Sequence, residues 1–175
     1  AGAWGAALSI QLLNSNNQVF LSSFDEANLN QIKKDRENKK YLPGFRLEKD
    51  LIIQPFSEKL VEGVDSIIVC VKSPYFKDAV LALKNSLNNK NLIWATKGFD
   101  PNSGDLLSSM VAEVITTEAN TAILSGPTFA EELAAGKPAA ITLATKVIDN
   151  SVSLAESMSN ESLRVYLSND PVGVQ

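Results

Sequence analysis

Residues 92–98 read LIWATKG, an apolar run that ends in a lysine and a glycine. The apolar residues are typical of a buried strand, and a glycine directly after Lys97 permits a sharp turn. In an open parallel sheet, ligands bind beyond the carboxyl ends of the strands. The stretch therefore predicts a strand whose end carries Lys97 into a ligand site, with a solvated surface lysine as the alternative.

Two further turns have the same character. Residues 122–124 form an apolar run that leads into SGPT at residues 125–128, and AGAWG at residues 1–5 opens a helix. Turns from strand to helix lie at one edge of a parallel sheet, so the three turns predict one shared ligand site. Thr128 has a structural alternative, because Thr128 and Glu131 fit a capping box in which the threonine caps the next helix.

Strand-like runs alternate with helical runs from end to end. This order predicts an α/β fold with a doubly wound, mostly parallel sheet. The run at residues 66–71 is apolar on both faces and is expected at the centre of the sheet, and a turn is expected at residues 41–44. The predicted strands are residues 18–22, 51–53, 66–71, 92–95, 122–124, 140–143 and 163–166, and the predicted helices are residues 4–13, 26–36, 57–61, 76–87, 106–115, 129–135 and 151–158.

The composition argues against several classes of function. The chain has 175 residues, a net charge of −4 and no histidine. Ser-His-Asp triads, Cys-His pairs and most zinc sites require histidine, so we expect no metal site. Any proton transfer must then fall to lysine, tyrosine or a carboxylate. The lysines are balanced by neighbouring acids, which argues against a nucleic-acid partner.

The single cysteine and the apolar runs bear on location. No apolar run reaches the roughly twenty residues of a membrane span, so we expect no membrane partner. Cys70 lies inside an apolar run and has no second cysteine to pair with, which favours a reducing compartment. Its expected role is core packing, with a reactive thiol as the alternative. We therefore expect a cytoplasmic protein.

The opening pentapeptide matches the dinucleotide-binding pattern G-x-G-x-x-G without its first glycine. Gly2 would let the backbone approach a pyrophosphate, and Gly5 would let the helix pack closely. The helix start would offer free N–H groups to the anion. Asp25 follows twenty residues after Gly5, the distance expected of a carboxylate that binds an adenosine ribose. NAD or NADP is the predicted cofactor, and a glycine-rich helix start without a ligand is the alternative.

The residues around Asp25 favour NAD over NADP. Residues 22–26 contain two acids and no arginine, so a 2′-phosphate would find no bidentate partner there. Phe24 beside Asp25, and Phe76 further along the chain, are apolar plates that could flank an adenine. Ordinary packing under a loop is the alternative for each ring.

Both ends of the sequence suggest a fragment. A strand normally precedes the glycine turn of a dinucleotide site, but here the turn opens the sequence. Residues 171–175 are apolar and resemble an uncapped helix start. We therefore expect one domain, residues 1–175, that is truncated at both ends and lacks the first strand of its sheet.

Several segments together resemble the NAD(P)-dependent glycerol-3-phosphate dehydrogenases. The resemblance implies a Rossmann-type cofactor domain followed by an all-helical substrate domain that this chain does not contain. It also implies a homodimer as the full-length protein. The segments are AGAWG at residues 1–5, RENKKYLPG at 36–44, WATKG at 94–98, SGPTFAEELAAGKPAA at 125–140 and SNDPVGVQ at 168–175.

The resemblance implies an activity and a set of site residues. Members of the family reduce dihydroxyacetone phosphate with NADH or NADPH to sn-glycerol 3-phosphate, which feeds phospholipid synthesis. The family's general acid, a second lysine, would follow the last residue of this sequence, so the fragment itself is expected to be inactive. By position, the cofactor residues would be Ala3, Trp4, Phe24 and Ala130, the substrate residues Gly126 and Thr128, and Lys97 would contact both.

The sequence departs from the family pattern at two places. Lys72-Ser73-Pro74 stands where the family often has proline-serine-histidine, which affects the expected shape of the cofactor groove. Phe24 stands where bacterial members commonly have a basic residue, which again favours NAD. Two alternatives remain, namely another Rossmann-type dehydrogenase and a non-catalytic dinucleotide-binding sensor. Replacing Lys97 by alanine in the full-length protein would separate an enzyme from a sensor.

Overall fold

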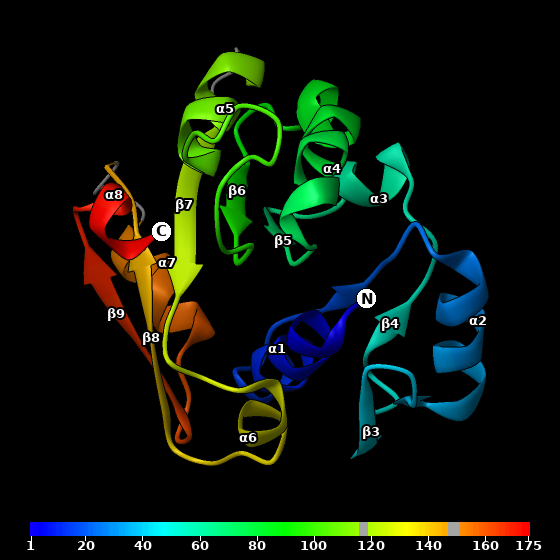
Figure 1. Ribbon diagram of the computed structural model, residues 1–175. Coiled ribbons are helices and arrows are strands. Elements are labelled where there is room, and N and C mark those ends of the chain that lie inside the picture. Colours follow the sequence, from blue (N-terminus) through cyan, green and yellow to red (C-terminus); the bar gives the residue numbers. More distant parts are fainter. Residues whose placement is uncertain (116–118, 147–150) are drawn as a thin grey trace. The chain divides into compact units, whose positions relative to one another are not determined.

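The computed structural model describes residues 1–115, 119–146 and 151–175 (Figure 1). The chain divides into two compact units, and each is described by itself. The first unit is Ala1–Phe56, Gly126–Ile141 and Ser153–Tyr166, and the second is Ser57–Ser125, Thr142–Val152 and Leu167–Gln175.

Strands of the described chain form one larger sheet and two pairs. The larger sheet has the order β5-β6-β7-β8-β9, in which β5, β6 and β7 run parallel and β8 runs antiparallel to β7. β1 pairs with β4 in parallel, and β2 pairs with β3 antiparallel. The predicted α/β fold with mostly parallel strands is confirmed. The strands are β1 Phe20–Leu21, β2 Glu37–Asn38, β3 Leu42–Arg46, β4 Ile52–Ile53, β5 Ser66–Val69, β6 Asn91–Trp94, β7 Asn120–Ser125, β8 Ala139–Ala144 and β9 Leu163–Ser168.

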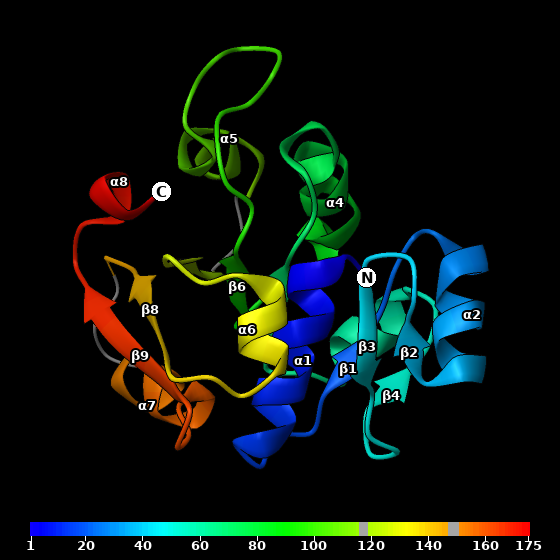
Figure 2. The ribbon, with the colours of Figure 1, turned by 60° about the horizontal axis from the view of Figure 1, so that its bottom comes forward.

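In the first unit, α1 (Ala3–Asn14) packs against α6 (Ala130–Ala134), and Figure 2 shows the two helices side by side. Ala6 and Ala7 have no exposed surface, so small side chains allow the close packing of α1. The β1–β4 pair and α2 (Glu26–Asp35) enclose an aliphatic core. The core residues are Val19, Leu21, Leu29, Ile32, Leu47, Leu51 and Ile53.

A hairpin between β2 and β3 replaces the turn expected at residues 41–44. That prediction was wrong, because the turn lies slightly earlier, where the Tyr41 N–H donates to Asn38 O at 3.1 Å. Pro43 then lies within β3, which forms a two-stranded sheet with β2 in the described part of the chain, and a missing N–H is tolerated in such an edge strand. Gly44 follows with φ +83°, in the left-handed region that favours glycine.

In the second unit, α4 (Phe76–Leu83) packs against α5 (Leu107–Val114), as Figure 1 shows in green. Three residues of β6 are buried. The sequence predicted residues 66–71 at the centre of the sheet, but β5 is its terminal strand and three of its four residues are half-buried. That prediction was wrong. The apolar composition of a strand indicates that other groups cover its faces, but it does not indicate whether one or two strands pair with it.

Helix ends differ from the predictions by a few residues, as local capping decides them. The predicted helix 76–87 ends at Leu83 and continues as a 3₁₀ turn, Lys84–Ser86, and another 3₁₀ turn, Ser73–Tyr75, precedes it. α8 (Pro171–Val174) is capped by Asp170, which accepts from Gly173 N at 2.9 Å, so the expectation of an uncapped start was wrong. The remaining helices are α3 Glu58–Glu62 and α7 Ser151–Met158.

Three observations bear on the expectations from composition. Burial raises the pKa of the Cys70 thiol to about 12, although the residue keeps part of its surface, so the protonated packing role fits better than a reactive thiol. Within the described residues, no group of three or more acidic or cysteine side chains could hold a metal ion. No helix of the described chain has the length and apolarity needed to cross a membrane.

Candidate functional site

The start of α1 carries no side-chain cap. Gly2, the N-cap residue, has extended backbone angles, and the first turn contains no acidic residue. The first intrahelical bond runs from Ala6 N to Gly2 O at 3.1 Å. The N–H groups of the first helical residues, Ala3 to Gly5, precede that bond and have no acceptor further back in the helix. With the partial positive charge of the helix end, they suit an anion.

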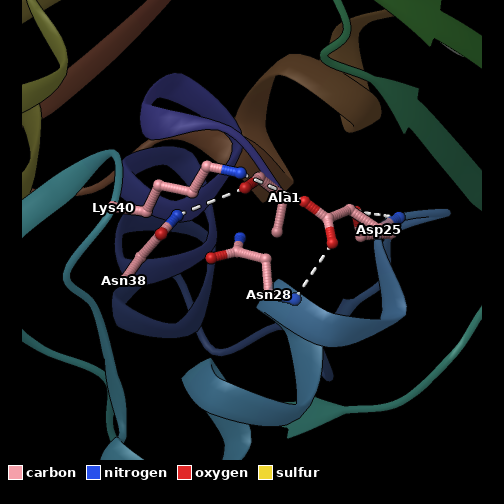
Figure 3. A network of polar contacts seen from close by, with 6 residues as sticks. Ala1, Asp25, Asn28, Asn38 and Lys40 are labelled. Atoms are coloured by element: carbon pink, nitrogen blue, oxygen red, sulfur yellow. Dashed lines mark hydrogen bonds and ion pairs between the residues drawn. The ribbon is translucent and has the colours of Figure 1, made fainter.

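Hydrogen bonds hold Ala1, the residue before the N-cap of α1, at its amino group and at its carbonyl oxygen. The amino group of Ala1 donates to Ser22 O at 3.3 Å, just after β1. The side-chain amide of Asn38, which is 1% exposed, donates to Ala1 O at 3.2 Å (Figure 3). The β2–β3 hairpin is thereby fixed beside the glycine turn.

Asp25 caps the next helix, α2. Its Oδ1 accepts from Asn28 N at 3.0 Å, and its Oδ2 pairs with Lys40 Nζ at 3.3 Å (Figure 3). The backbone bond from Asn28, followed by the Lys40 ammonium, lowers the pKa of the Asp25 carboxyl group. Asp25 is therefore an anion at neutral pH, as the predicted ribose contact requires.

Several buried polar atoms near Asp25 have no hydrogen-bond partner. Among the described residues, Ser22 Oγ, Asn28 Nδ2 and Asn38 Oδ1 are buried without a hydrogen bond. Buried polar groups normally find a protein partner, a water or a ligand. This polar setting fits a hydroxyl-bearing ligand such as a ribose.

Phe24 remains largely open. It is 60% exposed, and its ring contacts Phe56, with a centroid separation of 5.0 Å and an interplanar angle of 48°. The open surface is compatible with the predicted adenine contact. Phe56 is an additional candidate that the sequence did not indicate.

Residues 126–128 of the SGPT turn belong to the first unit and contact α1 there. The Trp4 indole N–H donates to Thr128 O at 3.2 Å. A Cβ added at Gly126 would lie 2.9 Å from Ala140 O, so this close backbone approach requires glycine. Ala130 is the first residue of α6 and is half-buried.

The capping-box prediction for Thr128 was wrong. The N-cap of α6 is Phe129, and no side chain caps the helix. The Thr128 hydroxyl donates instead to Ala140 O at 3.4 Å. Because the helix begins one residue later than the box requires, Thr128 and Glu131 do not cap it reciprocally.

Two predicted residues belong to the second unit. Lys97 is exposed and follows β6, and Thr96 before it donates from Oγ1 to Val71 O at 2.8 Å. Gly98 after it has φ +97°, which confirms the predicted turn. Phe76 has no exposed surface, and its ring centroid lies 5.9 Å from that of Trp94, which fits the packing alternative.

The structure therefore sorts the predicted residues into two sets. Sequence reasoning missed Asn38, Lys40 and Phe56, since no spacing rule links them to Asp25 or Phe24. Asn38 and Lys40 do lie in one of the segments that carry the family resemblance, which was their only signal. The first unit holds Gly2, Ala3, Trp4, Gly5, Phe24, Asp25, Gly126, Thr128 and Ala130, and the second holds Phe76 and Lys97.

Comparisons with known proteins agree on one family. The family model described as NAD-dependent glycerol-3-phosphate dehydrogenase N-terminus matches residues 1–151. The chain is 37% identical over 176 residues to glycerol-3-phosphate dehydrogenase [NAD(P)+] of Wigglesworthia glossinidia brevipalpis, covering 100% of this chain and 54% of the relative. It is 38% identical over 178 residues to the enzyme of that name from Francisella tularensis, covering 100% and 53%.

A solved structure has the same fold. The crystal structure of glycerol-3-phosphate dehydrogenase from Coxiella burnetii superposes with a TM-score of 0.91 at 30% identity, covering 99% of this chain and 53% of that one. The chain thus spans about half the length of the curated relatives it matches. Since the family model matches most of its length, the chain belongs to the NAD-dependent glycerol-3-phosphate dehydrogenase family.

Proposed function

We propose that this chain is the cofactor-binding half of an enzyme that reduces dihydroxyacetone phosphate to sn-glycerol 3-phosphate with NADH or NADPH. The observation that carries the proposal is the start of α1, which has no side-chain cap and lies in one network with Asp25. Family membership makes a dinucleotide the ligand to expect there. All of these contacts lie within the first unit.

The first unit would hold most of the cofactor. The N–H groups at Ala3, Trp4 and Gly5 would bind the pyrophosphate, and Gly2 would leave room for it. Asp25 would accept hydrogen bonds from the adenosine ribose, and Phe24 would contact the adenine. The dinucleotide, when bound, supplies the hydride. NADH is the expected form, because Asp25 repels a 2′-phosphate.

Lys97 would orient the substrate and stabilise charge on its reacting oxygen. A ketone that accepts hydride develops negative charge on that oxygen, and a positioned cation lowers the barrier. The bond from Thr96 to Val71 O and the left-handed Gly98 fix the backbone on both sides of Lys97. Gly126 and Thr128 would contact the substrate, and Ala130 the cofactor. The proposed role of Phe76 beside the cofactor stays a prediction.

The proposed domain organisation follows from the shared length. Because the chain spans about half of its relatives, we propose that residues 1–175 form the cofactor domain and that a separate substrate domain completes the enzyme. The 175 residues alone are then expected to be inactive. We further propose a cytoplasmic homodimer with a small phosphorylated substrate and without nucleic-acid or membrane partners.

Alanine at Lys97 in the full-length protein tests this function. We expect turnover of dihydroxyacetone phosphate to fall at least about a hundredfold, since a charge-stabilising donor is lost. NADH oxidation followed at 340 nm gives the rate. Lys77→Ala, which removes an exposed lysine on α4 of the same unit, is the matched control.

The outcomes separate the enzyme from the alternatives. Loss of turnover in Lys97→Ala alone supports the proposal. A wild-type protein that binds NADH but reduces no phosphorylated ketone would favour the dinucleotide sensor. Turnover of other substrates in place of dihydroxyacetone phosphate would favour a different Rossmann-type dehydrogenase.

A further inference from the structure

A cation lies beside the proposed ribose-binding carboxylate. Lys40 comes from the turn between β2 and β3, fifteen residues after Asp25, and its Nζ lies 3.3 Å from Asp25 Oδ2 (Figure 3). The bond from Asn38 to Ala1 O fixes the same hairpin next to the start of α1. Lys40 therefore lies in the network that carries the proposed function, although the sequence around Asp25 contains no cation.

The neighbouring cations of this segment are engaged elsewhere. Lys39 pairs with Asp35 at 2.8 Å. The Arg36 guanidinium donates to the carbonyl oxygens of Leu47 at 3.2 Å and Leu51 at 3.1 Å. Of these three basic residues, Lys40 is the one that contacts Asp25.

The Asp25–Lys40 pair is exposed enough to exchange partners. The side chains of Lys40 and Asp25 are 54% and 46% exposed, and pairs of this kind contribute little to stability. The Nζ also lies 4.9 Å from the centroid of the Tyr41 ring. Hydrogen bonding to Tyr41 and then to Asp25 raises the pKa of Lys40, so the side chain is a cation at neutral pH.

We propose that Lys40 and Asp25 together set the choice between NADH and NADPH, with Lys40 turning from the carboxylate to the 2′-phosphate when NADPH binds. The proposal rests on the proposed function, which places the adenosine ribose at Asp25. With NADH, Lys40 stays on Asp25 and the carboxylate accepts from the ribose hydroxyls. With NADPH, the phosphate meets the repulsion of Asp25, and Lys40 offsets part of it.

The two charges thus act in opposite directions on NADPH. A carboxylate close to a phosphate costs binding energy, and an ammonium that bonds the phosphate recovers part of that cost. Lysine acts here as a flexible point charge and needs no bidentate geometry. The structure therefore predicts a preference for NADH that is weaker than Asp25 alone would impose.

The test is titration of the full-length protein with NADH and with NADPH, following cofactor fluorescence. For Lys40→Gln, we expect the affinity for NADPH to fall about tenfold more than the affinity for NADH, because one charge-assisted contact is lost. Lys39→Gln is the matched control, because it removes an adjacent lysine that pairs with Asp35. Lys40→Arg retains the charge and should retain NADPH binding.

Each outcome decides the proposal. A ratio of NADPH to NADH affinity that changes in Lys40→Gln and not in Lys39→Gln supports it, as does rescue by Lys40→Arg. An equal change in both glutamine variants, or no change in the ratio, overturns the role of Lys40 and leaves the proposed function standing. A wild-type protein that binds neither dinucleotide overturns both.

Discussion

The first two helices of the chain begin in opposite ways. α2 has Asp25 as a side-chain cap, which occupies the Asn28 N–H, and Glu26 stands in its first turn. α1 has Gly2, which offers no side chain, and its first turn contains no acid. Both helices need partners for the N–H groups of their first turn. α2 is therefore capped by its own sequence, whereas α1 has no such cap, as the proposed dinucleotide site at its start requires.

The two helices also differ in how they are anchored. Gln11, in the second half of α1, is 1% exposed and donates to Leu133 O at 2.6 Å, and it accepts from Asn160 and Ser162. Gln31, on α2, is exposed and bonds only the neighbouring Asp35 at 2.7 Å among the described contacts. α1 is therefore held firmly at its far end, which leaves its start in a fixed position without using the N–H groups there.

Giving α1 the aspartate cap that α2 has should produce the largest effect, which is a loss of dinucleotide affinity. Gly2→Asp places a carboxylate at the N-cap, where the extended backbone accepts any residue. We expect dinucleotide affinity of the full-length protein to fall about a hundredfold, because like charges in contact cost several kcal/mol. Calorimetric titration with NADH measures the loss. Gly2→Ser, a neutral cap, should lose less, and equal losses would exclude charge as the cause.

Removing the anchor of α1 should have the next largest effect. Gln11→Ala removes the side-chain amide that donates to Leu133 O, and it removes the amide oxygen that accepts from Asn160. We expect a loss of about 2 kcal/mol in the free energy of unfolding, since a buried side chain loses several hydrogen bonds at once, although Leu133 O keeps the bond from Gly136 N and Asn160 keeps its bond to Gln11 O. Urea unfolding of the full-length protein gives the value. Gln31→Ala on α2 is the matched glutamine, and a loss as large there would refute the distinction.

Protonation of Asp25, the cap of α2, should have the smallest effect. It lowers the melting temperature only in acid. Since the pKa of Asp25 is lowered on folding, its contribution is present above the unfolded value near 3.8 and is lost as pH falls through the folded value. The melting temperature of wild type should therefore drop more between pH 5 and pH 3 than that of Asp25→Asn. Asparagine keeps the capping oxygen but does not titrate. Parallel curves for the two proteins would contradict this assignment.

The sequence predicted the local features of the fold well. Apolar runs indicated β6 and β7, and α7 covers residues 151–158, where a helix was predicted. The predicted turn after Lys97 is present, and the structure places Gly98 in the left-handed region there. These features depend on neighbours along the chain, which is why patterns of adjacent residues were sufficient.

The failures involve partners distant in sequence. Thr128 was expected to cap its own helix, but it bonds Ala140 O across the turn. Lys40 went unnoticed because the hairpin that brings it to Asp25 was predicted as a simple turn. The terminal place of β5 depends on which strands pair, and apolar content does not encode this. Tertiary contacts decided each of these cases.

The most direct test of the central claim is an amide NMR titration of the full-length protein with NADH. Selective ¹⁵N labelling would report Ala3, Trp4 and Gly5 at the start of α1, and Ala27 and Asn28 at the start of α2. We expect large shifts at the first three amides and small ones at Asn28, whose N–H stays on Asp25. Shifts confined to α2, or absent from α1 at saturating NADH, would contradict the claim that the start of α1 binds the cofactor.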